Sequence, residues 1–135
     1  MIVVDTNILI AVYIQGPRSE KVSELLRRDS QWRIPELWRH EFLNVLVTYG
    51  RVGKISPVVL AAMWQKAFKE NAALEEPLDM AHALKLAFTH HLSGYDAQFV
   101  CLAETLRVPL ITEDRKLQTL LPRTAISIEH FLTRP

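Results

Sequence analysis

The chain has 135 residues, of which 49% are hydrophobic and 23% are charged. This size and balance predict one folded domain spanning residues 1–135 and exclude a disordered chain. The formal net charge is only +1, because 16 lysines and arginines are offset by 15 acidic residues. A uniformly basic coat for nucleic acid is therefore excluded, and any such contact has to come from a local patch.

The cysteine content and the apolar runs point to the compartment. Cys101 is the only cysteine, so an internal disulfide is impossible and a secreted disulfide scaffold is excluded. The apolar run over residues 8–14 is much shorter than the ~20 residues that a membrane span needs, and no basic leader precedes it. We therefore expect a soluble cytoplasmic protein with no membrane partner.

Short apolar strands alternate with longer helical patterns along the chain. In the first half of the chain we expect a strand at 2–4, helices at 6–14 and 19–28, a strand at 32–34, a helix from 35 to Gly50 or Gly53, and a helix from 57 to 68. A short strand or loop is expected within 73–78, followed by helices at 80–90 and 95–106 and a strand at 108–111. The chain is then expected to form a short helix after 114, a strand at 125–128 and a terminal helical turn. Ser19 and Asp79 are expected to cap the helices that begin beside them.

This alternation predicts an α/β protein, a three-layer α/β/α sandwich with a central, mainly parallel sheet. Residues 2–4 lack polar alternation, as expected for a strand covered on both faces. In such sheets the functional crevice lies beyond the carboxyl ends of the strands, where the strand order reverses.

Four acidic residues are candidates for that crevice. Asp5 directly follows the first strand, and Asp114 follows the strand that ends at residue 111. Asp96 lies at the start of the helix that leads into that strand, and Glu41 lies inside an earlier helix. Carboxylates gathered at one crevice repel one another unless a cation or protons neutralise them, and hard divalent cations prefer oxygen ligands.

Each acid also has a simpler interpretation. Aspartate is a favoured helix cap, and Asp5, Asp96 and Asp114 all lie at or just before expected helix starts. Glu41 alone is best explained as a solvent-exposed glutamate beside Arg39 or Lys54. The sequence favours a site only when the four acids are considered together.

Four motifs resemble those of the PIN-domain ribonucleases. Residues 3–7 (Val-Val-Asp-Thr-Asn) resemble their opening, 41–46 (Glu-Phe-Leu-Asn-Val-Leu) their acidic helix, 92–97 (Leu-Ser-Gly-Tyr-Asp-Ala) their third motif, and 109–114 (Pro-Leu-Ile-Thr-Glu-Asp) their fourth. The motifs occur in order, and the resemblance extends from about residue 2 to residue 128. Within this superfamily the chain is most similar to the VapC-type toxins of toxin–antitoxin modules.

The resemblance implies a PIN-like, Rossmann-like fold and RNA cleavage that depends on Mg²⁺ or Mn²⁺. The family's catalytic, metal-binding acids correspond to Asp5, Glu41, Asp96 and Asp114. Its small hydroxyl residue corresponds to Thr112, and Asn7 matches an asparagine with an orienting role. One departure concerns the position three residues after Asp114. It is Leu117, whereas some relatives carry a further acid that takes part in binding a second metal.

The resemblance also implies partners: an RNA substrate, a cognate antitoxin protein and a second copy of the chain in a homodimer. RNA has to approach an acidic crevice, so cations are expected at its rim. Arg115, Lys116 and Arg39 are the candidate RNA-binding residues, and Arg18 and Lys21 lie at the start of the second expected helix, near where the first strand is expected to point. Solvent-exposed surface charge is the alternative explanation for each of them.

Other functions fit the sequence less well. A phosphatase of the haloacid-dehalogenase type needs an acid two positions after the first, where this chain has Asn7. A signalling receiver domain needs paired early acids and a lysine after a late strand, where this chain has Glu113 and Asp114. A housekeeping RNA-processing PIN nuclease and a non-catalytic PIN scaffold remain open alternatives to a toxin.

Overall fold

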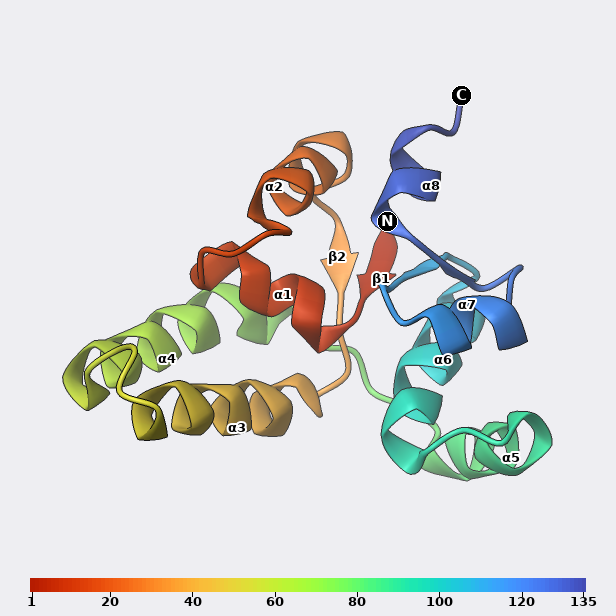
Figure 1. Ribbon diagram of the computed structural model, residues 1–135. Coiled ribbons are helices and arrows are strands. Elements are labelled where there is room, and N and C mark those ends of the chain that lie inside the picture. Colours follow the sequence, from red (N-terminus) through yellow and green to blue (C-terminus); the bar gives the residue numbers. More distant parts are fainter.

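The computed structural model describes residues 1–135 and contains a small sheet flanked by helices (Figure 1). The strands are β1 (Ile2–Val4), β2 (Trp32–Arg33), β3 (Leu110–Ile111) and β4 (Ala125–Ile126). The helices are α1 (Thr6–Tyr13), α2 (Ser19–Arg28), α3 (Trp38–Arg51), α4 (Pro57–Asn71), the 3₁₀ helix η1 (Ala72–Leu74), α5 (Met80–His90), α6 (Gly94–Leu106), α7 (Arg115–Leu120) and α8 (Ile128–Leu132). The strand order is β2-β1-β3-β4, and every neighbouring pair is parallel. The predicted α/β class with a parallel sheet is confirmed.

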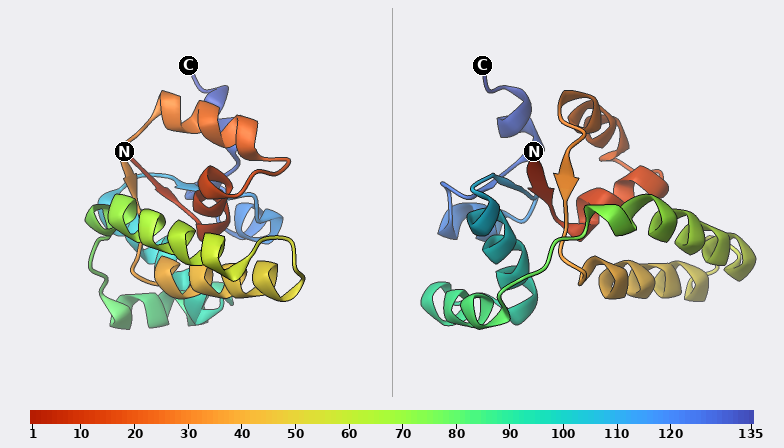
Figure 2. Two further views of the ribbon diagram at one scale, coloured as in Figure 1. Left: turned by 90° about the vertical axis from the view of Figure 1, so that its left-hand side faces the viewer. Right: turned by 180° about the vertical axis from the view of Figure 1, so that it is seen from behind.

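The sheet is covered on both faces, and its strands β1, β3 and β4 are buried and apolar at successive positions. Ile2 and Val4 pack into one core with α1, α2, α3, α4 and α8, whereas Val3 packs into a second core with α5, α6 and α7. Leu110 and Ile111 of β3 divide between the two cores in the same way. Figure 2 shows the resulting three layers, with the α3–α4 pair on one side of the sheet and the α5–α6 pair on the other.

The strands expected at 32–34, 108–111 and 125–128 are shorter in the structure, and the stretch 73–78 forms no strand. The stretch 73–78 forms η1 and a single bridge between Ile34 and Glu75. Pro77 lies two residues after that bridge, and proline is disfavoured inside a strand. The strand expected over 125–128 ends at Ile126, because the side chain of Ser127 accepts a hydrogen bond from the backbone N–H of His130 at 3.0 Å and so caps α8.

Of the expected helix caps, Ser19 and Asp96 are wrong, whereas Asp5, Asp79 and Asp114 are confirmed. The Ser19 hydroxyl accepts a hydrogen bond from the N–H of Gly16 at 2.9 Å, so α2 begins without a side-chain cap. Ser93 caps α6 by accepting from the N–H of Asp96 at 3.0 Å, so the carboxylate of Asp96 is not used as a cap. Asp79 caps α5 as predicted, at 3.1 Å from the N–H of His82.

The topology brings two chain segments together at one edge of the sheet. The N–H of Asp5 donates to the carbonyl of Ile111 at 3.1 Å, and the N–H of Thr112 donates to the carbonyl of Ile126 at 3.0 Å. The chain leaves β1 toward β2 on one side, while β3 lies on the other side. This is the reversal of strand order at which open parallel sheets form their crevice.

None of the helices has both the length and the apolar character needed to cross a bilayer.

Candidate active site

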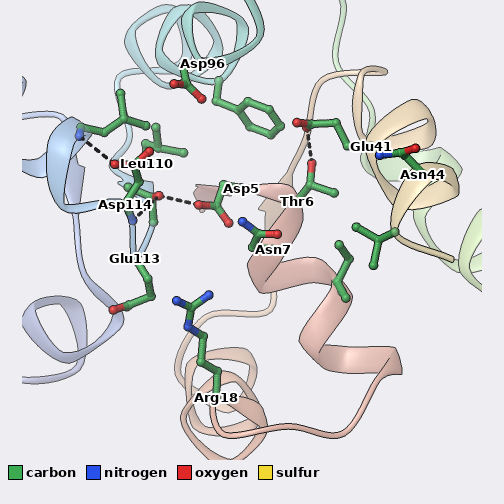
Figure 3. A pocket seen from close by; sticks show the side chains of 15 residues that line it. Asp5, Thr6, Asn7, Arg18, Glu41, Asn44, Asp96, Leu110, Glu113 and Asp114 are labelled. Atoms are coloured by element: carbon green, nitrogen blue, oxygen red, sulfur yellow. Dashed lines mark hydrogen bonds between the residues drawn. The ribbon is translucent and has the colours of Figure 1, made fainter. Parts of the chain in front are cut away.

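A pocket of about 460 Å³ opens at the carboxyl ends of β1 and β3 (Figure 3). The four acids that the sequence singled out all line it: Asp5, Glu41, Asp96 and Asp114. Asn7 and Thr112, predicted as supporting residues, line it as well. The structure therefore brings six predicted site residues together from four separate parts of the chain.

Asp5 lies where β1 ends and both caps α1 and lines the pocket. Its Oδ1 accepts a hydrogen bond from the N–H of Ile8 at 3.0 Å, and its Oδ2 accepts one from the hydroxyl of Thr112. Burial raises the pKa of Asp5 to about 6, although both hydrogen bonds and the charge of Arg18 lower it. The helix-cap and pocket interpretations are therefore compatible for this residue.

Thr112 connects two of the acids. It is fully buried, and its hydroxyl donates to Asp5 while accepting from the N–H of Asp114 at 3.1 Å. Its carbonyl accepts a hydrogen bond from the side chain of Gln118 at 2.7 Å, which ties this turn to α7. Thr112 thus fixes the relative positions of Asp5 and the Asp114 backbone.

Asp114 caps α7 with one carboxylate oxygen and leaves the other free. Its Oδ1 accepts from the backbone N–H groups of Lys116 and Leu117 at 2.9 and 3.3 Å. Its Oδ2 accepts no hydrogen bond within the protein. An anchored carboxylate with one unused oxygen is suited to binding a cation.

Glu41 lies on α3 and reaches the pocket from the side opposite β3. It is half-buried, and its Oε1 accepts a hydrogen bond from the hydroxyl of Thr6 at 2.7 Å (Figure 3). Burial raises the pKa of Glu41, the Thr6 hydrogen bond lowers it, and the charge of Asp96 raises it again. The alternative in which Glu41 is simply solvent-exposed beside Arg39 or Lys54 is therefore wrong.

Asp96 projects from the first turn of α6 and is half-buried. Burial raises its pKa first, and the charge of Asp114 raises it further. The hydrogen bond with Ser93 and the charge of Lys116 lower the pKa of Asp96. The charge of Asp114 thus raises the pKa of Asp96, and the charge of Asp96 raises the pKa of Glu41. The pocket therefore holds carboxylates that repel one another.

The donor set fits a hard divalent cation that keeps part of its water shell. Five carboxylates line the pocket, and Arg18 is the only cation among the lining residues. No three Asp, Glu, His or Cys side chains are grouped closely enough to form a complete metal cage. A site that binds an ion through one or two carboxylates together with water and substrate phosphate, as is common for Mg²⁺, does not need such a group of three.

The predicted RNA-binding cations lie in different places. Arg39 forms two hydrogen bonds with the carboxylate of Glu75, at 2.6 and 2.7 Å, and lies over the ring of Phe68. The expectation that Arg39 lies at the pocket rim is therefore wrong. Arg115 and Lys116 are exposed at the start of α7 and do not line the pocket, although Lys116 is near enough to lower the pKa of Asp96.

Three further polar residues of the pocket had no predicted role, namely Thr6, Asn44 and Glu113. The polar spacing of Glu41 and Asn44 on one helix indicates a shared face, and this signal was available in the sequence. The hydrogen bond between Thr6 and Glu41 could not be predicted from the sequence, because the two residues are far apart in the chain and meet only through the packing of α1 against α3.

Comparisons with known proteins agree with this architecture. The chain matches the model of the PIN domain over residues 2–120. Ribonuclease VapC3 of Pyrobaculum aerophilum is 30% identical over 127 residues, which cover 90% of this chain and 95% of that protein.

Solved structures show the same fold at lower identity. PAE2754 from Pyrobaculum aerophilum superposes with a TM-score of 0.73 at 22% identity, covering 97% of this chain and 92% of its own. FitAcB from Neisseria gonorrhoeae gives 0.72 at 18% identity, with 96% and 99% covered. A toxin–antitoxin complex from Klebsiella pneumoniae gives 0.67 at 20% identity, with 95% and 98% covered. Together with the match over residues 2–120, these likenesses confirm the predicted resemblance, and the chain belongs to the PIN domain family.

Proposed function

We propose that this protein is a divalent-metal-dependent endoribonuclease that acts as the toxin of a type II toxin–antitoxin module. The main support is the convergence of Asp5, Glu41, Asp96 and Asp114 on one pocket, where their charges need a cation. The name of the relative, a VapC ribonuclease, supports RNA as the substrate. The toxin–antitoxin complex among the similar structures supports an antitoxin partner.

The four acids have distinct roles in this proposal. Asp5, Asp96 and Asp114 would hold Mg²⁺ or Mn²⁺, directly or through water, and Glu41 would complete or orient the site. When bound, such an ion supplies Lewis acidity, which offsets charge on the phosphate and makes water a better nucleophile at neutral pH. Hydrolysis adds water across the P–O3′ bond and leaves a 3′-hydroxyl and a 5′-phosphate.

The protein contributes positioning. Asp5 is held at both oxygens, and Thr112 fixes its distance from the Asp114 turn. Glu41 is held at Oε1 by Thr6, and its Oε2 accepts no hydrogen bond within the protein. That free oxygen is available to accept a hydrogen bond from a water molecule in the pocket and so to orient it for attack.

Two assemblies belong to the proposal. A cognate antitoxin would neutralise the enzyme, and two copies of the chain would form a homodimer. Expression with and without the adjacent antitoxin gene tests the toxin role: growth arrest that the neighbour relieves is expected, whereas harmless expression in both cases would favour a housekeeping nuclease.

A metal titration tests the enzymatic part of the proposal. The purified protein is incubated with mixed RNAs in EDTA and then with increasing Mg²⁺ or Mn²⁺, and the new RNA ends are mapped. Cleavage is expected only with the divalent ion and only at defined positions. Absence of metal-dependent cleavage of every RNA class would favour a non-catalytic PIN scaffold.

Thr6→Val is expected to slow RNA cleavage by about tenfold while the protein remains folded. The buried hydroxyl of Thr6 is the only group that hydrogen-bonds Glu41, and a hydrogen bond to a charged group contributes about 1.5–3 kcal/mol. Cleavage rates at saturating Mg²⁺ measure the effect. Thr6→Ser should retain the rate, and Thr48→Val on the exposed part of α3 serves as the control. Equal rates for Thr6→Val and Thr48→Val would rule out a positioning role for Thr6.

A further inference from the structure

The acidic pocket continues into a second groove that has no role in the proposed chemistry. This groove measures about 410 Å³ and is bounded by the end of α1, the segment 15–18 and the face of α3 that carries Val45 and Tyr49. It shares Asn7, Ile10, Arg18 and Val45 with the acidic pocket. Its volume falls within the range of about 300–1,000 Å³ that is typical of ligand pockets.

Arg18 stands at the junction of the two cavities. It is the only cation that lines either of them. Figure 3 shows its guanidinium extending from the start of α2 toward Asn7 and Glu113, away from Asp96. Although five carboxylates line the acidic pocket, the guanidinium forms no ion pair and no hydrogen bond within the protein. Arg39, in contrast, uses its guanidinium to bind Glu75 at two points.

The backbone that carries Arg18 is fixed. The hydroxyl of the buried Ser19 accepts from the N–H of Gly16 at 2.9 Å, and the N–H of Ser19 donates back to the Gly16 carbonyl at 3.1 Å. The carbonyl of Arg18 accepts the N–H of Val22 at 2.9 Å in the first turn of α2. A guanidinium with unused donors on a fixed backbone is suited to bidentate binding of a phosphate.

We propose that this groove binds the RNA strand next to the cleaved bond and that Arg18 binds a backbone phosphate where the strand passes from the acidic pocket into the groove. The inference rests on the proposed ribonuclease function. An RNA strand entering a pocket of carboxylates is repelled except where a bound cation or a basic side chain offsets the charge, and Arg18 supplies that charge at the junction. The groove itself carries no acidic residue, so a polyanion can follow it without repulsion from its lining.

Arg18→Ala and Gln15→Glu test the inference. Gln15 lines only the groove, and its replacement by glutamate keeps the shape while adding a charge that repels phosphate. Arg27→Ala on the exposed face of α2 and Gln65→Glu on α4 are the matched controls, since neither residue lines the pocket or the groove. Binding of a fluorescein-labelled, mixed-sequence single-stranded RNA is measured at several salt concentrations in an Asp96→Asn background, and cleavage is measured in the otherwise wild-type chain.

Arg18→Ala is expected to weaken RNA binding about tenfold and to reduce the dependence of log K on log salt by about 0.7, the value for one phosphate contact on a single strand. Gln15→Glu is expected to weaken binding and cleavage in the same direction. If cleavage fell in Arg18→Ala with an unchanged salt slope, Arg18 would act on Asp5 rather than on RNA, and the inference would be wrong.

The remaining outcomes separate this inference from the function on which it rests. Loss of all metal-dependent cleavage in the wild-type chain refutes the proposed function itself. If the wild-type chain cleaves RNA normally and Arg18→Ala and Gln15→Glu bind and cleave RNA like their controls, only the proposal that the groove binds RNA is refuted. The ligand of Arg18 would then be an anionic group of a protein partner.

Discussion

Asp5→Asn is expected to reduce RNA cleavage by at least about 10³-fold while the protein stays folded. Asp5 is the acid most firmly anchored in the pocket, with hydrogen bonds at both oxygens, and its charge would help to hold the ion. Asparagine keeps a side-chain oxygen that can accept from the N–H of Ile8, so α1 retains its cap. Initial rates of RNA cleavage at saturating Mg²⁺ measure the loss, and circular dichroism verifies the fold.

The matched control for this substitution is Asp79→Asn. Asp79 is also a helix N-cap, with its Oδ1 at 3.1 Å from the N–H of His82, but it does not line the pocket. It should retain full activity. Full nuclease activity in purified Asp5→Asn protein would remove Asp5 from the catalytic site.

The same substitution is expected to stabilise the metal-free protein by about 2–3 kcal/mol above pH 6. Burial raises the pKa of Asp5 from 3.8 in the unfolded chain to about 6 in the folded one. The folded state therefore binds this proton more tightly, so the wild-type free energy of unfolding is highest below pH 4 and falls as the pH rises toward 6. A difference of about two pKa units corresponds to about 3 kcal/mol, and asparagine has no such ionisation.

Urea unfolding of both proteins in EDTA between pH 3.5 and 8, a range that spans both pKa values, measures this effect. The difference should be largest above pH 6 and should disappear as the pH approaches 4. Saturating Mg²⁺ should reverse the order at neutral pH, because an ion that binds only the folded wild-type site stabilises it. A stability difference that does not vary with pH would contradict a buried, ionising Asp5.

Only some of the site's features could be predicted from the sequence. The apolar residues of β1 and β3 and the turns that follow them are local signals, and they were enough to place Asp5 and Asp114 at neighbouring strand ends. The position of Asp96 near a helix start was also predicted, but the expectation that its carboxylate caps that helix was wrong. Ser93 caps α6, and this leaves the Asp96 carboxylate free for the pocket.

Glu41 shows the limit of local reasoning. Considered alone, Glu41 is best explained as a solvent-exposed glutamate, and its site role was expected only from the four acids taken together and from the family resemblance. The packing of α3 against α1 decides the matter, because it brings Glu41 within 2.7 Å of the Thr6 hydroxyl. Arg39 was expected at the pocket rim because it lies two residues before Glu41 in the sequence. Glu41 lines the pocket, but the side chain of Arg39 points toward Glu75 instead.

The sequence by itself determined the alternation of strands and helices, the apolar character of both sheet faces and the four acids, because each of these is written in residue type and short-range spacing. The tertiary structure alone decided which polar groups meet: Thr6 with Glu41, Thr112 with Asp5, and an unpaired Arg18 between two cavities. The physical reason is that hydrogen bonds and charge interactions act over a few ångströms. Residues far apart in the chain come within that distance only when the cores on the two faces of the sheet fix the helices against it.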